Sequence, residues 1–408
     1  MSSVTGSTAI DVAALRDRFP AIAEGAAHFD GPGGSQVPEP VAGAVATTLR
    51  SAISNRGRST ASERRADDIV VDARAAMGDL LGADPGGVVF GRSMTQLTYD
   101  FSRTLAKRWH AGDEVVVSRL DHDANVRPWV QAAEAVGATV KWIDFDPDTG
   151  ELTLEHVRDA LSDRTRLVAL TGASNLIGTR PPLAEISGVV KQTGALFYVD
   201  GVHLTAHALV DLEALGADFF ACSPYKFCGP HCGVLAARPE LLERLEPDKL
   251  LPSTDEVPER FEFGTLPYEL LAGTAAAVNF LATLAPSDGT RRERLGRSMA
   301  AVAVHEDGLR EQIERGLAEL PGVTLYSRAA ERTPTLLFTM AAHRPRDIQL
   351  HLAQQQVNAP AGSFYAIEPS RRLGLGSDGG VRVGLAPYND SSDVERLLSG
   401  LASLTGGS

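Results

Sequence analysis

Short apolar runs alternate with helix-like stretches through the first two thirds of the chain. The intervening stretches include residues 128–136 and 183–192. Apolar runs separated by helices are typical of a mostly parallel sheet, whose strands are buried on both faces by the crossover helices. The pattern predicts an α/β fold with a large, mostly parallel sheet of seven strands, located at 88–90, 114–119, 140–145, 166–171, 196–200, 218–223 and 233–237.

The pattern changes after a turn-like stretch at 286–289. Fewer strands and longer helices follow, which indicates a smaller α+β domain at the C-terminus. The expected elements are helices at 291–319, 345–356 and 391–404 and strands at 323–327, 335–340 and 381–385. We therefore expect three parts: a tail and helix over 1–27, a large domain over 28–285, and a small domain over 290–408.

The N-terminal part carries one helical pattern of its own. Val12, Leu15, Phe19 and Ile22 recur at helical spacing, and Asp11 is placed to cap the helix. The spacing predicts a helix that packs on either domain.

Length, net charge and cysteine content limit which partners and which cellular compartment we expect for this protein. A chain of 408 residues is long enough for two domains, and its net charge of −13 argues against nucleic acid or an anionic membrane as a partner. No apolar run approaches the ~20 residues of a membrane helix. The first ten residues lack the pattern of a secretory signal and are expected to form a polar tail, which favours a cytoplasmic protein. The 3 cysteines lie too close together for a disulfide framework.

Polar residues that follow the apolar runs are the first candidates for chemistry, because ligands bind beyond the carboxyl ends of parallel strands. Ser93, Met94 and Thr95 open a probable helix after the first run, where backbone N–H groups and hydroxyls suit a phosphate. Taken alone, this stretch is read more simply as a helix cap. His122 follows the second run, and a single histidine there also suits a structural hydrogen bond.

Asp200 and Lys226 change this interpretation. Asp200 ends an apolar strand, where a carboxylate is costly without a cation or donor. Lys226 lies between apolar strands, and a buried lysine with a lowered pKa is the usual Schiff-base former. An amine, a carboxylate and a phosphate anchor are the groups that pyridoxal 5′-phosphate (PLP) needs. A plain ion pair between Asp200 and Lys226 is the alternative, but it leaves the other polar strand ends unexplained.

The sequence around these two residues resembles a known family. The stretches YVDGVH (198–203) and ACSPYKFCGP (221–230) resemble the PLP site of the class V aminotransferases. Within that family the chain is most similar to the cysteine desulfurase and selenocysteine lyase branch. The similarity runs from HFDGPGGSQVP (28–38) to VRVGLAPYN (381–389), and it implies the fold of type I PLP enzymes.

The resemblance implies a role for each site residue. Lys226 would carry the cofactor and act as the base, Asp200 would meet the ring nitrogen, and His122 would stack on the ring. Asn175 and His203 would lie near the ring hydroxyl, with Asn175 also touching substrate. The phosphate would be held by Met94, Thr95, Ser223 and Tyr225, and by Thr265 of a second subunit in a homodimer.

Arg382 would hold the substrate carboxylate, for which its planar fork is suited. It alternates with Val381 and Val383 and so would face away from their apolar side. An exposed strand arginine is the alternative. Tyr365 and Arg56 are candidates to shape the side-chain pocket, with surface or packing roles as the alternatives.

The chain also departs from the family pattern. The family's desulfurases take sulfur on a cysteine of a mobile loop, whereas the corresponding loop here, 357–366, has no cysteine and has Asn358 near the place of a common arginine. Tyr225 stands before the lysine, where the family usually has His, Gln or Arg.

The clustered cysteines have three interpretations. Cys222, Cys228 and Cys232 suit buried packing better than sulfur acceptance, which needs an exposed thiolate of low pKa. With His231 they also count as four zinc ligands, but without a C-x₂-C pair. We expect no metal.

The sequence therefore predicts a PLP-dependent enzyme acting on a small α-amino acid, with a cysteine desulfurase-like lyase of a Cβ–heteroatom bond, C–S above all, as the leading hypothesis. β-Elimination needs no cysteine nucleophile. An aminotransferase or an epimerase is the alternative, since one cofactor scaffold supports many reactions. The third hypothesis is a non-catalytic PLP-binding protein in sulfur metabolism.

Overall fold

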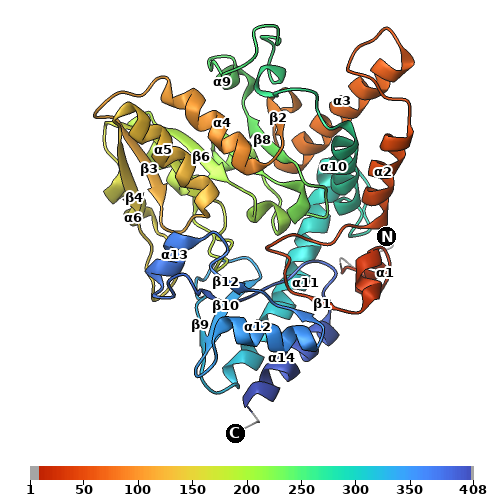
Figure 1. Cartoon of the computed structure of the whole chain (residues 1–408), viewed down its shortest axis with the longest axis vertical. Helices are drawn as coiled ribbons and strands as arrows, with labels where there is room; N and C mark the ends of the chain where they lie inside the picture. The colour runs from red at the N-terminus through yellow and green to blue at the C-terminus, as the bar shows by residue number, and fades with distance from the viewer. Residues whose placement is uncertain (1–8, 406–408) are drawn as a thin grey trace, which may run out of the picture.

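The computed structural model describes residues 9–405, and most of the expected N-terminal tail lies outside this range. Within these residues the strands form three sheets, of seven, four and two strands. Figure 1 shows the large sheet and its helices in the upper part of the molecule and the smaller sheets below, with the C-terminal residues in blue. None of the helices in this range is long and apolar enough to cross a membrane.

The seven-stranded sheet confirms the predicted fold class. Its order is β2-β8-β7-β6-β5-β3-β4, and β8 is antiparallel to both of its neighbours while the other pairs are parallel. Each predicted apolar run forms one strand. The strands are β2 (Val88–Gly91), β3 (Glu114–Ser118), β4 (Thr139–Ile143), β5 (Thr165–Thr171), β6 (Leu196–Asp200), β7 (Phe219–Cys222) and β8 (Gly233–Ala237).

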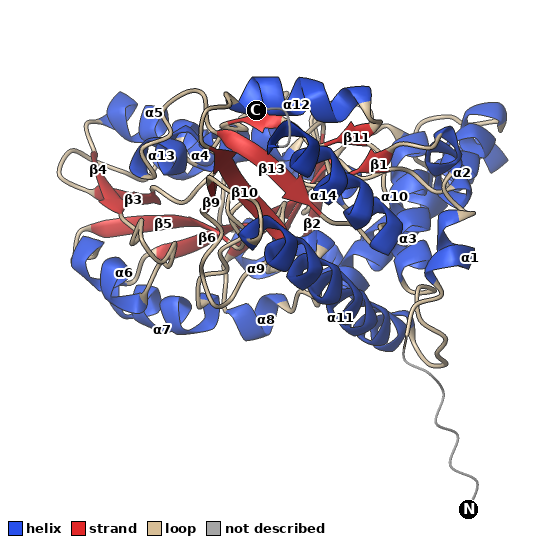
Figure 2. Cartoon of the chain, turned by 90° about the horizontal axis from the view of Figure 1, so that it is seen from below, coloured by secondary structure: helices blue, strands red, loops and turns tan. Residues whose placement is uncertain are grey.

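Both faces of this sheet are buried, as near-continuous apolar strands require. Side chains alternate between two cores: Phe197 and Val199 of β6 belong to one, and Tyr198 belongs to the other. Figure 2 shows α4 (Met94–Ala106) and α5 (Arg127–Val136) on one face, and α6 (Leu154–Ala160), α7 (Leu183–Thr193) and α8 (Leu212–Leu215) on the other.

The C-terminal part is built on an antiparallel sheet in the order β12-β13-β10-β9. Its strands are β9 (Val323–Leu325), β10 (Thr335–Met340), β12 (Ala361–Gly362) and β13 (Gly380–Gly384). Its helices are α11 (Arg291–Ala318), α12 (Pro345–Gln354), α13 (Ile367–Arg372) and α14 (Ser391–Thr405). The short strands β1 (Ala27–His28) and β11 (Val357–Asn358) pair in parallel beside it. The division into domains at 28–285 and 290–408 stays a prediction.

The N-terminal helix is shorter than its apolar spacing predicts. Helix α1 (Val12–Arg16) is followed by a 3-10 helix (Pro20–Glu24), because Pro20 starts a new turn without an N–H to continue the first. Arg16 donates to Tyr388 O at 2.7 Å, and Phe19 packs on both Phe280 and Tyr388. The remaining helices are α2 (Glu39–Arg50), α3 (Ala61–Leu81), α9 (Pro239–Leu242) and α10 (Tyr268–Leu281).

Candidate active site

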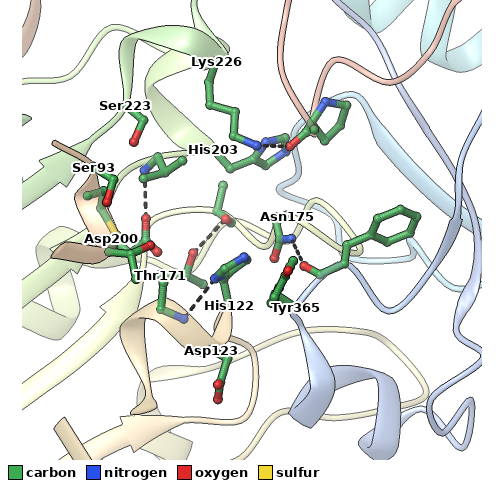
Figure 3. Close-up of a pocket in the computed structure, with 18 of the residues that line it drawn as sticks. Ser93, His122, Asp123, Thr171, Asn175, Asp200, His203, Ser223, Lys226 and Tyr365 are labelled. Carbon is green, nitrogen blue, oxygen red and sulfur yellow. Dashed lines mark hydrogen bonds between the residues drawn. The ribbon is translucent and has the colours of Figure 1, made fainter. Parts of the chain in front are cut away.

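A cavity of about 610 Å³ opens at the carboxyl ends of β5, β6 and β7. Its walls also come from the N-terminal segment around Pro32 and from C-terminal residues such as Phe364, so three distant parts of the chain meet there (Figure 3). Of the residues singled out from the sequence, the cavity gathers Met94, Thr95, His122, Asn175, Asp200, His203, Ser223, Tyr225, Lys226, Tyr365 and Arg382.

Lys226 ends a 3-10 turn (Pro224–Lys226) that directly follows β7. Its ammonium group donates to Pro32 O and lies 4.8 Å from the ring centroid of Tyr225. Burial lowers the pKa of Lys226 to about 7, and the positive charge of Arg382 acts in the same direction. A large share of this amine is therefore uncharged and nucleophilic at neutral pH.

Asp200 lies at the end of β6 with a side chain removed from water. Its Oδ1 accepts from Val202 N at 2.9 Å, while burial raises its pKa to about 6, partly offset by that hydrogen bond and by Lys226. A carboxylate in this position is stabilised by any cation that enters the cavity beside it.

Asp121 is a second buried acid that the sequence analysis did not single out. It accepts from Ser118 Oγ and from Asn125 Nδ2, the latter at 2.7 Å. Burial raises its pKa to about 8, and the charge of Asp200 adds to the effect. The available signal in the sequence is the position of Asp121, which comes shortly after an apolar strand and directly before His122.

The N-terminus of α4 also lines the cavity. Ser93 caps the helix by accepting from Gln96 N at 3.1 Å, and Met94 and Thr95 supply its first turn. Gly233 lets β8 approach this turn, because a Cβ there would lie 2.2 Å from the carbonyl carbon of Ser93. Ser223, which directly follows β7, is buried and lines the same cavity. The first N–H groups of a helix make this a site for an anion.

His122 is held as a neutral imidazole. Its Nδ1 accepts from Ala124 N at 3.0 Å, so the proton resides on Nε2. Burial lowers its pKa to about 4, and the charge of Lys226 contributes. Its ring lies 5.5 Å from that of Tyr365.

His203 and Asn175 connect the cavity to the C-terminal part. His203 Nε2 lies 2.9 Å from Thr333 Oγ1 and 3.0 Å from Thr335 Oγ1, and burial lowers its pKa well below the usual value. Asn175 Nδ2 donates to Phe364 O at 3.0 Å, while its buried Oδ1 has no hydrogen-bond partner among the described residues.

Arg382 is buried, and its side chain turns into the cavity while Val381 and Val383 pack in the C-terminal core. It is thus not the exposed strand arginine of the alternative interpretation. Its Nη1 donates to Asn175 O at 2.9 Å, and its guanidinium carbon lies 3.7 Å from the ring centroid of Phe364. Burial lowers its pKa to about 9, at which the group is still charged at neutral pH.

Two singled-out residues lie outside this cavity. Thr265 lines a separate cavity of about 490 Å³ together with Arg92 and His231. Arg56 is bound to Asp67 at 2.9 Å and to Glu259 at 2.8 Å, which makes it part of an ion-pair network within the chain.

The three cysteines are buried and unpaired. Burial raises the pKa of Cys228 to about 12 and that of Cys232 to about 11, and it raises the pKa of Cys222 as well. These thiols are buried and protonated, whereas a sulfur acceptor is an exposed thiolate of low pKa. Within residues 9–405 no group of three or more His, Cys, Asp or Glu is arranged to hold a metal.

The cavity fits PLP in size and in its donor set. A buried amine, a buried carboxylate, an unpartnered amide oxygen on Asn175 and a helix N-terminus all face one space. The fold and this site together define a PLP-dependent enzyme of fold type I.

The comparison with known proteins gives the family. Residues 27–397 match the aminotransferase class-V family, and the chain belongs to it.

Relatives of similar length carry differing names. The chain is 35% identical to an uncharacterised protein of Mycobacterium tuberculosis, with 97% of this chain and 100% of the relative covered. It is 31% identical to a probable cysteine desulfurase of Pseudomonas aeruginosa (95% and 96% covered) and 30% identical to an aminotransferase-like protein of Gibberella zeae (97% and 98% covered). The cysteine desulfurase of Thermococcus onnurineus NA1 superposes with a TM-score of 0.89 at 25% identity, covering 99% of this chain and 100% of that one.

Proposed function

We propose that the protein is a β-lyase that breaks the Cβ–S bond of a cysteine-like amino acid. The observation that carries the proposal is the combination of Lys226, Asp200 and Arg382 around one cavity with a covering loop, 357–366, that contains no thiol. The amine, carboxylate and guanidinium serve any reaction at the Cα of an amino acid. The missing thiol favours elimination over transfer of sulfur to the protein.

The same residues would hold the cofactor. Lys226 would bind its aldehyde carbon, Asp200 would face its ring nitrogen, and His122 would lie against its ring. The first turn of α4, with Ser223 and Tyr225, would hold the phosphate. PLP, when bound, withdraws electrons from the bonds at the substrate's Cα.

Each residue then has a step of its own. Arg382 binds the substrate carboxylate and orients the Cα–H bond toward Lys226. The amine of Lys226 takes the Cα proton, a role for which a pKa near neutrality is suited. His122 Nε2–H would donate a hydrogen bond to the departing sulfur. With cysteine and water the balance is one sulfide, one ammonia and one pyruvate.

We also propose a homodimer in which Thr265 reaches the partner's phosphate site. Thr265 lies outside the lysine cavity of its own chain, on a stretch that exposes Phe263 at 44%. Leu250 and Leu251, on the preceding loop, are 70% and 97% exposed. A second copy that covers these apolar side chains would bring Thr265 close to another active site. We place the enzyme in the cytoplasm, where its unpaired thiols stay reduced.

The test is a product screen of the loaded enzyme with cysteine, cystine and cysteine sulfinate. Pyruvate and a released sulfur species in equal amounts support the β-lyase. Alanine in place of pyruvate shows desulfuration and overturns the proposal. Lys226→Ala is the control, since it must abolish turnover of every substrate.

An aminotransferase is the second candidate, favoured by the name of the Gibberella zeae relative. It would yield an α-keto acid that keeps its sulfur, with the amino group left on the cofactor. An epimerase would yield only the racemised amino acid. Either result overturns the lyase and leaves the cofactor site in place.

A further inference from the structure

The covering loop places an aromatic ring on the buried arginine of the cavity. The guanidinium carbon of Arg382 lies 3.7 Å from the ring centroid of Phe364, well inside the ~6 Å range of a cation–π contact. The neighbouring Tyr365 does something different, because its ring faces His122 at 5.5 Å and its side chain is 77% exposed. The loop thus presents one ring to the cation and one to the cavity mouth.

The loop is held in this position by contacts with the segments that follow β5 and β3 of the large sheet. Phe364 O accepts from Asn175 Nδ2 at 3.0 Å, and Tyr365 O accepts from Asp123 N at 2.8 Å (Figure 3 labels Asn175, Tyr365 and Asp123). Phe364 and Tyr365 both have left-handed backbones, with φ of 54° and 57°. Two successive non-glycine residues in this region cost about 1–2 kcal/mol each, so the contacts must offset that cost.

The guanidinium under this ring keeps binding capacity that the chain does not use. Among the described residues the guanidinium of Arg382 makes one hydrogen bond, from Nη1 to Asn175 O, and its buried Nε has no partner. No carboxylate in residues 9–405 lies close enough to form an ion pair with it, and the negative charge of Asp30 acts on the guanidinium only from a greater distance. A buried, unpaired cation gains strongly from an incoming anion.

We propose that Phe364 is a positioning residue for the substrate carboxylate, acting through Arg382. A carboxylate binds a guanidinium through the edge, where the N–H groups point, and not through the face. A ring on the face fixes the plane of the guanidinium and excludes water from it without consuming an N–H. The edge then remains free for the carboxylate of an α-amino acid. In this chain the loop holds the carboxylate clamp in place, whereas in the family's desulfurases it carries a thiol.

The inference rests on the proposed function only in assuming a carboxylate substrate, and it is tested without turnover. The probe is propionate, a carboxylate with no amino group, and propionamide is its uncharged counterpart. Binding to the cofactor-loaded enzyme is followed by calorimetry. Phe364→Leu removes the ring but keeps an apolar side chain, and we expect the Kd for propionate to rise about 5- to 30-fold.

Two further variants separate positioning from packing. Phe364→Tyr keeps an aromatic ring on the guanidinium, so its Kd for propionate should equal the wild-type value. Tyr326→Leu is the matched control, since the Tyr326 ring lies 5.6 Å from the guanidinium of Arg328 and is not part of the cavity lining, so its loss should leave the Kd unchanged. Phe364→Met replaces Phe364→Leu should the latter fail to fold.

The outcomes are decisive whatever the enzyme's reaction is. An unchanged Kd in a folded Phe364→Leu protein overturns the inference. Propionate binding that is as weak in Phe364→Tyr as in Phe364→Leu overturns it as well. A Kd for propionate equal to that for propionamide shows that Arg382 does not bind a carboxylate and overturns it too. Failure of the product screen with intact propionate results would overturn the lyase alone.

Discussion

The positive charge of Arg382 lowers the pKa of Lys226, second only to burial, and Asp200 acts on the same amine in the opposite sense. Both charged groups line one cavity with the lysine. Arg382 and Asp200 therefore both help to set the protonation state of the Lys226 amine.

Removing either charge should move the pKa of Lys226 in a defined direction. In protein stripped of cofactor, the rate of PLP attachment should rise through a midpoint near pH 7, where the amine loses its proton. Arg382→Met should move this midpoint to higher pH, and Asp200→Asn should move it to lower pH. Stopped-flow absorbance at a series of pH values measures the shift.

Arg127→Met is the control for this experiment. Arg127 lines the same cavity but does not act on the pKa of Lys226. The midpoint of PLP attachment in Arg127→Met should therefore equal the wild-type midpoint. Shifts of the same sign in Arg382→Met and Asp200→Asn would contradict the electrostatic account.

Gly233→Ala should disturb the N-terminus of α4, where we propose that the phosphate of PLP binds. The added methyl group would lie 2.2 Å from the carbonyl carbon of Ser93 and 2.6 Å from Met94 N, so the first turn of α4 must move. We expect a loss of about 1–3 kcal/mol in the free energy of unfolding and weaker binding of PLP. Denaturant titration and calorimetry measure the two effects.

Gly188→Ala is the matched control for a glycine replaced by alanine. Gly188 lies in α7, and nothing lies within 4 Å of the Cβ that would be added. It should stabilise the protein by about 0.5–1 kcal/mol through helix propensity and leave PLP binding unchanged. Equal PLP affinity in both variants would contradict the role given to Gly233.

The three cysteines should resist alkylation in the native protein. Burial raises the pKa of Cys228 to about 12 and of Cys232 to about 11, so neither forms a thiolate near neutral pH. Mass spectrometry after iodoacetamide should find no label in buffer and 3 labels in denaturant. A persulfide or a label on Cys228 during turnover with cysteine would contradict a thiol-free elimination.

The large sheet and most of its site could be predicted from the sequence. Strands such as β6 are buried on both faces, so they are visible in the sequence as apolar runs. The residues that follow each parallel run lie at the carboxyl edge of the sheet, where ligands bind. Asp200 and Lys226 stand out because a carboxylate and an amine are rare beside such runs. Family resemblance, and not spacing, supplied the roles of Asn175 and Arg382.

The covering loop could not be predicted from local pattern. The hydrogen bond from Asn175 to Phe364 joins residues 189 positions apart. The composition of the two stretches does not predict this contact. The two-residue strands β11 and β12 are too short to show an alternation. The ion pair between Arg56 and Glu259 is a similar case, because the two residues lie 203 positions apart along the chain.

Asp121 should make the stability of the cofactor-free protein fall as pH rises. Burial raises its pKa from 3.8 in a model peptide to about 8, so the folded state holds a proton that the unfolded state releases. The contribution of Asp121 to the free energy of unfolding is fully present below pH 4. It is lost as pH rises toward 8, at no more than about 1.4 kcal/mol per pH unit. Asp200, raised to about 6, adds a similar loss only between pH 4 and 6. Asp121→Asn should therefore remove the fall in the free energy of unfolding that Asp121 causes between pH 6 and 8, and it should leave only the Asp200 share of the fall between pH 4 and 6. Urea titrations at each pH measure both slopes. The exposed control Asp163→Asn should keep the wild-type curve, and a slope that survives in Asp121→Asn would assign the effect to another group.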